Sequence, residues 1–171
     1  GAGEQAVELY QTIHARLQHG EPLANATAEG LDAWREKHGK IVPGFGHRFH
    51  PIDPRAPRLL QLIDEAAERG EISGQFASIA REIEHQLGKA KGKPIPLNID
   101  GATAAVYAEL DFPAPLARGL FCLSRSVGIL AHAWEQKCQG GRNKGPIPKG
   151  WLWQYQGHPP RHLEDKNAEG H

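Results

Sequence analysis

Residues 73–87 read SGQFASIAREIEHQL, and their apolar side chains follow the period of an α-helix. Five of them recur at intervals of three and four residues: Phe76, Ile79, Ala80, Ile83 and Leu87. This spacing places all five on one face of a helix, which can then pack against a neighbouring element. Gly88 follows directly and is typical of a helix end. The stretch therefore predicts an amphipathic helix over residues 73–87.

Apolar residues return at helical spacing in one segment after another, and no period of two persists for the length of a strand. This pattern predicts further helices over residues 3–18, 27–38, 54–69, 98–110 and 115–138. The last of these could be one long helix or two abutting ones. Residues 89–96, KAKGKPIP, contain two prolines and predict an extended linker. The predicted fold class is all-α.

The composition indicates a globular chain with no strong overall charge. The 171 residues are 39% hydrophobic, and 20 Lys plus Arg balance 20 Asp plus Glu. This balance argues against a nucleic-acid partner, and no apolar run approaches the roughly 20 residues that would suggest a membrane span. Cys122 and Cys138 are too far apart for a zinc knuckle and too few for a disulfide scaffold. We expect them to be buried free thiols in a cytoplasmic protein.

Both ends of the chain are unusual. The sequence has no methionine and opens with GAGEQAVELY as though already inside a helix, so we expect the later part of a longer product. Residues 164–171, EDKNAEGH, have too few apolar side chains to pack against a core. We expect a disordered tail there, and its last residues could be the remnant of a purification tag.

The first candidate functional motif is PGFGHR, residues 43–48. Gly44 and Gly46 can adopt positive φ angles, which would let the backbone approach a ligand closely and direct N–H groups toward it. His47 and Arg48 would then stand beside that ligand. A glycine turn with a surface histidine produces the same pattern, so the motif alone leaves both interpretations open.

The second motif is NIDG, residues 98–101, at the start of a predicted helix. Asp100 is expected at the N-cap, where its carboxylate would accept N–H groups of the first turn and would be favoured in its ionised form. Most aspartates in that position are caps and nothing more. Capping is therefore the alternative to a chemical role for Asp100.

The third motif is LSRSVG, residues 123–128, which places Arg125 inside an apolar helix. Burying an unpaired guanidinium is costly, so Arg125 must reach solvent or pair with an anion. That anion could be a carboxylate of this protein or a substrate carboxylate bound by both arms of the guanidinium. Both remain open on the residues alone.

Four stretches, in their order and spacing, resemble the carboxyl-terminal part of the citrate synthase superfamily: GAGEQAVELY, IVPGFGHRFHPIDPRA, PLNIDGATAAVYAELDFP and LFCLSRSVGILAHAWEQ. The resemblance extends to about residue 138. It implies a citrate synthase-like fold with a small helical, coenzyme A-binding domain over residues 1–112. Residues 113–163 would return to a large domain, and a homodimer would be the usual assembly.

The resemblance also implies roles for single residues. His47 matches the histidine that bonds the reacting carbonyl oxygen of oxaloacetate, and Asp100 matches the aspartate that exchanges a proton with the acetyl methyl carbon. Arg55 and Arg125 match arginines that bind the substrate carboxylates. The coenzyme A thioester is the only cofactor implied.

The surface that would receive coenzyme A includes the turn Gly44, Phe45, Gly46, the neighbouring Arg48, and the pair Lys91 and Lys93. No metal is expected, because His47 and His50 have no third ligand near them in the sequence.

Two departures from the family pattern bear on the reaction. A further catalytic histidine of the family lies in an HGGA-like motif, and this sequence begins at the GA that would follow it. The arginine expected after the last long helix has no clear counterpart; Arg142, Lys144 and Lys149 are candidates.

NIDG, the LSRSVG helix with EQK at its end, and the lack of a clear counterpart to that arginine make the chain look closer to citryl-CoA lyases than to typical synthases. The expected activity is cleavage of citryl-CoA to acetyl-CoA and oxaloacetate. Citrate or methylcitrate synthase, an acyltransferase, is the alternative within the family, and a non-catalytic acyl-CoA-binding partner is the alternative of another class.

Overall fold

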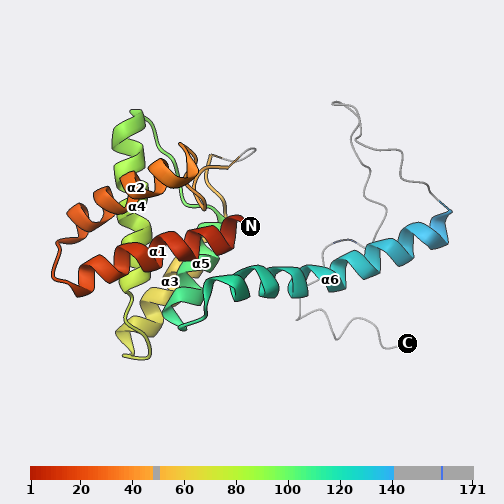
Figure 1. Ribbon diagram of the computed structural model, residues 1–171. Coiled ribbons are helices and arrows are strands. Elements are labelled where there is room, and N and C mark those ends of the chain that lie inside the picture. The colour runs from red at the N-terminus through yellow and green to blue at the C-terminus, as the bar shows by residue number, and fades with distance from the viewer. Residues whose placement is uncertain (48–50, 141–158, 160–171) are drawn as a thin grey trace. The chain divides into compact units, whose positions relative to one another are not determined.

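The computed structural model describes residues 1–47, 51–140 and 159 (Figure 1). These residues form helices and loops with no strand: α1 Ala2–Gln18, α2 Leu23–His38, α3 Ala56–Glu68, α4 Gln75–Lys91, α5 Ile99–Glu109 and α6 Ala114–Gln139. The prediction of an all-α fold is confirmed. The chain divides into two compact units, residues 1–131 and 132–171. All residues discussed below as a site belong to the first unit.

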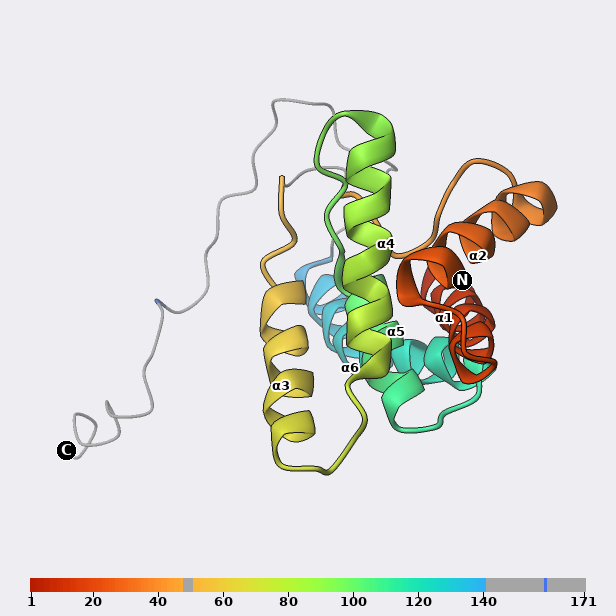
Figure 2. The same ribbon diagram turned by 90° about the vertical axis from the view of Figure 1, so that its left-hand side faces the viewer.

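Helix α5 lies at the centre of the packed helices and contacts α1, α3 and α4. Its buried positions are all small: Gly101, Ala102, Ala104, Ala105 and Ala108. Small side chains allow neighbouring helices to approach α5 closely, and larger apolar residues of those helices fill the remaining space. Figure 2 shows α3 on one side of α4 and the pair α1 and α2 on the other, in agreement with their contacts.

Tyr10 of α1 ties that helix to α5. Its side chain is fully buried, and its hydroxyl donates a hydrogen bond to the carbonyl oxygen of Gly101 over 3.2 Å. Burial raises the pKa of Tyr10, so the phenol stays neutral and remains a donor. This bond fixes the first turn of α5, where one of the sequence motifs lies.

Two helix boundaries differ from the predictions by more than two residues. Helix α2 begins at Leu23, four residues before the predicted start at Thr27, because Pro22 has the extended backbone of a helix N-cap. Helix α4 continues through Gly88 to Lys91, and Gly92 ends it with a φ of 63°. One glycine inside a helix costs only about 1 kcal/mol, which the buried face of α4 outweighs.

Helix α6 is a single long helix, one of the two predicted alternatives. Only Ala114 and Ala117 are buried on it, and its larger apolar side chains are exposed: Leu116, Phe121, Leu123, Val127, Ile129, Leu130 and Trp134. Cys122 and Cys138 are also exposed, so the prediction that they are buried was wrong. By length and composition α6 could cross a membrane, contrary to expectation, but the core helix of a soluble protein passes the same test.

Candidate active site

The PGFGHR and NIDG motifs lie side by side, although about fifty residues separate them. Phe45 and Leu97 form an isolated antiparallel bridge. The N–H of Gly46 donates to the Pro96 carbonyl over 2.7 Å, and the N–H of Asn98 donates to the Gly44 carbonyl over 3.0 Å. The loop after α2 is thereby held against the start of α5.

Two glycines make this contact possible. Gly44 has a φ of 87°, as its motif predicted, and a Cβ there would lie 2.7 Å from the Cα of Gly101. In turn, a Cβ on Gly101 would lie 2.4 Å from the Gly44 carbonyl oxygen. The positive φ of Gly44 therefore allows its close approach to α5, and its role beside a ligand stays a prediction. Gly46 has a φ of 77°, and a Cβ there would contact only the side chain of Ile95, at 4.0 Å.

Asn98, and not Asp100, is the N-cap of α5. Its Oδ1 accepts the N–H groups of Asp100 over 2.9 Å and Gly101 over 3.2 Å, while its Nδ2 donates to the Gly46 carbonyl over 2.7 Å. The prediction that Asp100 caps the helix was wrong, because the asparagine two residues earlier already accepts the first-turn donors. The carboxylate of Asp100 is left available for another purpose.

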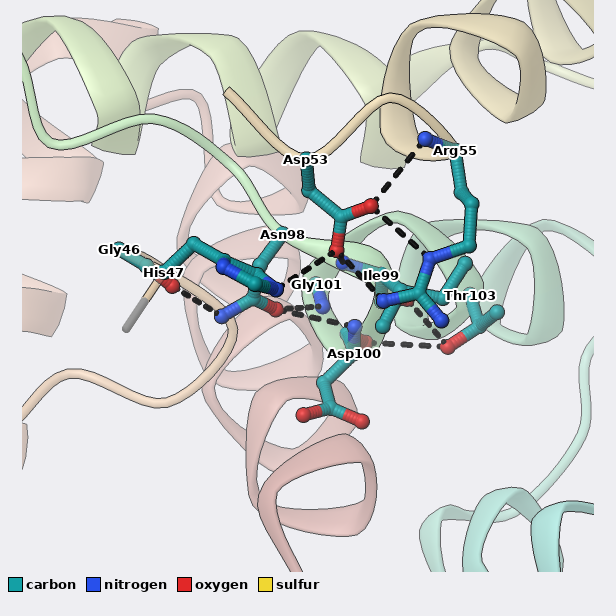
Figure 3. Close-up of polar contacts among 9 residues, drawn as sticks. All are labelled: Gly46, His47, Asp53, Arg55, Asn98, Ile99, Asp100, Gly101 and Thr103. Carbon is teal, nitrogen blue, oxygen red and sulfur yellow. Dashed lines mark hydrogen bonds and ion pairs between the residues drawn. The ribbon is translucent and has the colours of Figure 1, made fainter. Parts of the chain in front are cut away.

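Asp53 lies at the centre of the polar network in Figure 3. Its Oδ1 accepts the backbone N–H and the Nε–H of Arg55 over 3.1 and 2.9 Å. Its Oδ2 accepts Nη2–H of Arg55 and the N–H of Ile99, each over 2.9 Å. These bonds connect the segment before α3 to the first residue of α5.

The ion pair between Asp53 and Arg55 favours the charged form of both side chains. The hydrogen bonds from the Arg55 side chain lower the pKa of Asp53, although burial alone would raise it. The same bonds raise the pKa of Arg55, and the nearby negative charge of Asp100 adds to that effect. Both side chains are therefore ionised across the physiological pH range.

The structure brings together three of the four predicted catalytic and substrate-binding residues. The Nε2 atom of His47 lies 4.0 Å from Oδ2 of Asp53, and Arg55 is paired with the same carboxylate. Figure 3 shows the carboxylate of Asp100 directed away from this network, and it makes no hydrogen bond with any part of the chain that is described. His47 and Asp100 are partly exposed, and the Arg55 side chain is 57% exposed, so a ligand can reach all three.

One residue of the surface predicted to receive coenzyme A, Lys93, lines a hollow. An open hollow of about 580 Å³ lies at the end of α4, lined by Glu84, His85, Gly88, Lys89, Gly92, Lys93, Pro94 and Ile95. Of the two lysines singled out from the sequence, Lys93 lines the hollow and Lys91 does not. Ile95, which is next to Gly46, connects this hollow to the glycine turn.

Arg125 is not brought to this network. Among the described residues, its recorded contact is with the ring of Phe121 on the same helix, 5.3 Å from the guanidinium carbon to the ring centre. The predicted Arg48, and the candidates Arg142, Lys144 and Lys149, lie outside the described residues.

Sequence reasoning missed two residues of the site, Asp53 and Asn98. A signal existed for each. Asp53 stands before a proline and two residues before Arg55, a spacing at which a carboxylate can bond the following backbone and side chain. Asn98 is a preferred N-cap residue that follows a proline-rich linker.

Comparisons with known proteins agree with this arrangement. The family described as "Citrate synthase, C-terminal domain" matches residues 1–147. A citrate synthase of Acidithiobacillus ferridurans is 32% identical over 139 residues, which are 80% of this chain and 34% of the relative. The chain thus spans about a third of the length of that curated relative.

Two solved structures have the same fold. The citryl-CoA lyase of Hydrogenobacter thermophilus superposes with a TM-score of 0.62 at 29% identity, covering 95% of this chain and 59% of the lyase. A citrate synthase of Thermoplasma acidophilum, in a ternary complex with carboxymethyl coenzyme A and oxaloacetate, superposes with a TM-score of 0.63 at 24% identity, covering 94% of this chain and 41% of that synthase. The chain belongs to the citrate synthase family, and it matches the carboxyl-terminal domain of that family.

Proposed function

We propose that this chain is part of an enzyme that cleaves citryl-CoA to acetyl-CoA and oxaloacetate through an enol or enolate. The observation that carries the proposal is the meeting of three motif residues from distant parts of the sequence. His47 and Arg55 face the same buried carboxylate, that of Asp53. Asp100 is near enough for its charge to act on Arg55, and its carboxylate is directed away from Asp53 and makes no hydrogen bond with the described residues.

The reaction requires groups of these types. Breaking a carbon–carbon bond beside a thioester leaves an enolate, so a carboxylic acid must return a proton to carbon. Asp100 is suited to this step, because Asn98 caps the helix and the Asp100 carboxylate is not needed as an acceptor for the first-turn N–H groups. His47 is suited to moving the proton at the citryl hydroxyl, which becomes the ketone of oxaloacetate.

Arg55 is suited to binding a substrate carboxylate. Its pairing with Asp53 uses Nε and Nη2, so Nη1 and one further N–H remain for a ligand. A guanidinium matches the geometry of a carboxylate and stays charged throughout the reaction.

Coenzyme A would lie along the hollow at the end of α4. Lys89 and Lys93 line it and would attract the phosphates, while the backbone of the turn Gly44, Phe45, Gly46 would meet the adenine beside Ile95. We include Lys91 and Arg48 in this surface on the family resemblance alone.

We further propose that residues 1–112 form the small domain and that residues 113–163 belong to a large domain. The apolar side chains exposed on α6 support this, because they require a covering surface. A core helix is a better account of α6 than a membrane span, since the family match runs through it. Arg125 would bind substrate once α6 is covered. A cytoplasmic homodimer rests on the resemblance.

The direction of the reaction is the finer part of the proposal. The citrate synthase relatives favour condensation of acyl-CoA with oxaloacetate as the second candidate. Gly101 of NIDG has a packing reason of its own, because any Cβ would strike the Gly44 carbonyl. The preference for the lyase therefore rests mainly on the sequence after residue 139, where the arginine that the family pattern places there has no clear counterpart.

One experiment separates these candidates. Full-length protein is given citryl-CoA in one reaction and acetyl-CoA with oxaloacetate in another, and the products are separated by chromatography. We expect acetyl-CoA and oxaloacetate from citryl-CoA to form much faster than citrate and free coenzyme A. Citrate and free thiol as the main products would show a synthase, and no turnover would favour the non-catalytic partner.

A further inference from the structure

Asp53 is the one charged side chain that is fully buried among the residues that the structure describes. A buried carboxylate without partners is strongly unfavourable, so its position must be justified by the groups around it. Four N–H groups lie within 3.1 Å of its two oxygens, three from Arg55 and one from Ile99. These four bonds fix the orientation of the Asp53 carboxylate, and they also fix the positions of the groups that donate them.

We propose that Asp53 is a positioning residue for the reaction: it holds the guanidinium of Arg55 and the first turn of α5, and it faces the imidazole of His47. The proposal rests on the proposed function and deepens it. Asp53 is too deeply buried to touch the substrate, so it acts through the residues that do.

The hold on Arg55 fixes the direction of its free donors. Two bonds, Nε to Oδ1 and Nη2 to Oδ2, set the plane of the guanidinium, and the backbone bond sets the start of the side chain. A long, rotamer-rich side chain is thereby prepared to bind a carboxylate without losing further entropy. Without Asp53, Arg55 would keep its charge and lose its direction.

The hold on α5 fixes the direction of Asp100. Asp53 accepts the N–H of Ile99, and Asn98 accepts the next two N–H groups of the first turn. The negative charge of Asp53 also lies at the positive end of the helix dipole. Because these three backbone donors are occupied, the reactive group at this helix start is the Asp100 side chain, carried on a turn that cannot shift freely.

The approach to His47 is electrostatic. A separation of 4.0 Å between Nε2 and Oδ2 is too long for a hydrogen bond and short enough for attraction to a protonated ring. His47 and Arg55 are therefore drawn toward the same point from two sides of one carboxylate.

Asp53 could instead serve folding alone, and Glu109 provides the matched control. Glu109 lies at the other end of α5 and accepts Ser73 Oγ–H and the N–H groups of Gly74 and Phe76, so it also holds a helix start. It is not part of the network of Asp53. Asp53→Asn and Glu109→Gln each remove one carboxylate that connects an end of α5 to a neighbouring segment.

The test measures oxaloacetate binding by calorimetry and citryl-CoA kinetics on full-length protein below the melting temperature of each variant. Asp53→Asn should weaken oxaloacetate binding by about tenfold or more and lower kcat as well. Glu109→Gln should lower the melting temperature and leave oxaloacetate affinity and kcat within about twofold of the wild-type values. Equal kinetic and binding losses in the two variants would overturn the positioning role.

A second pair of variants tests the hold on α5 even if Asp53→Asn does not fold. Ile99→Pro removes only the N–H that Asp53 accepts, at a helix position where proline is tolerated, and Ile99→Ala is its control. We expect Ile99→Pro to lower kcat by about tenfold relative to Ile99→Ala, with oxaloacetate affinity unchanged. Equal kcat values would overturn this part of the proposal.

The two proposals fail in different ways. If wild-type protein does not cleave citryl-CoA and Asp53→Asn still loses oxaloacetate affinity, the proposed function is wrong and the hold on Arg55 is right. If wild-type protein neither turns over citryl-CoA nor binds oxaloacetate, both are wrong.

Discussion

Helices α5 and α6 are both apolar in sequence, yet they have opposite environments in the structure. In α5 the buried positions are alanines and one glycine, and α1, α3 and α4 pack against this helix. In α6 the apolar positions are large, and Leu123, Val127 and Leu130 are 68%, 72% and 73% exposed. The comparison shows that an apolar helix becomes part of a core only where a complementary surface is present, and that the described residues supply one for α5 alone.

The polar groups of the two helices differ in the same way. At the start of α5 each described donor has a partner, and Asp53 and Asn98 accept them. On α6, the guanidinium of Arg125 lies over the face of the Phe121 ring on the same helix. The proposed chemistry is therefore organised at α5, while Arg125 would join it only through a surface that covers α6.

The largest effect on stability should distinguish the two environments with the same substitution. Ile79→Ala removes a fully buried side chain, so the free energy of unfolding of the 171-residue chain should fall by about 2–5 kcal/mol. Ile129→Ala removes one that is 62% exposed and should change it by less than about 0.5 kcal/mol. Urea titration measures both, and similar losses would mean that α6 is covered in this chain.

The contact between the glycine turn and α5 is tested by two glycines with nearly the same φ angle. Gly44 and Gly39 have φ angles of 87° and 85°, but a Cβ on Gly39 meets nothing within 4 Å. Gly39→Ala should cost about 1–3 kcal/mol of unfolding free energy from backbone strain, because its ψ of -171° at positive φ is a conformation that residues other than glycine rarely adopt. Gly44→Ala should cost at least about 1 kcal/mol more, because its Cβ meets the backbone of Gly101. Equal costs would contradict the close approach.

The cap of α5 should have a smaller effect. Asn98→Ala should lower the free energy of unfolding by about 1 kcal/mol, because two first-turn N–H groups lose their acceptor. Asn25→Ala, on the exposed side of α2, is the control and should be neutral or slightly stabilising. A neutral Asn98→Ala would return the capping role to Asp100.

The last predicted effect is the pH dependence of the stability that Asp53 contributes, which appears only at acidic pH. The bonds from Arg55 lower the pKa of Asp53 in the folded chain, so Asp53 contributes stability that is complete above its unfolded pKa of about 4. That contribution is lost as the pH falls below this value. Between about pH 4 and 2, unfolding free energy should therefore fall more steeply for wild type than for Asp53→Asn. Parallel curves from urea titration would show that the pair does not stabilise the fold.

The hydrophobic pattern predicted the helices well and their ends less well. The i, i+3, i+4 spacing located α4 because the same residues are buried in the structure. Gly88 and Thr27 were misread as boundaries, because packing of a whole helix face outweighs the local preference of one residue. The exposure of Cys122 and Cys138 could not be predicted, because it depends on whether another surface covers α6.

The site was predictable in its parts and not in its connections. The motifs identified His47, Arg55 and Asp100, and these lie together. The role of Asp53 depends on the approach of Ile99, 46 residues away along the chain, which no local pattern contains. The capping error had a local origin, since Asn98 and Asp100 are both good N-cap residues and only the backbone decides between them.

The most direct test of the account follows the proton that Asp100 is proposed to move. Full-length protein is incubated with acetyl-CoA and oxaloacetate in deuterated water, and loss of the methyl proton signal of acetyl-CoA is followed by nuclear magnetic resonance. Asp111→Asn, at the other end of α5 and exposed, is the control and should match wild type. Asp100→Asn should fold normally and slow the exchange by on the order of 10²–10⁴-fold. Exchange at the wild-type rate in Asp100→Asn would contradict the account.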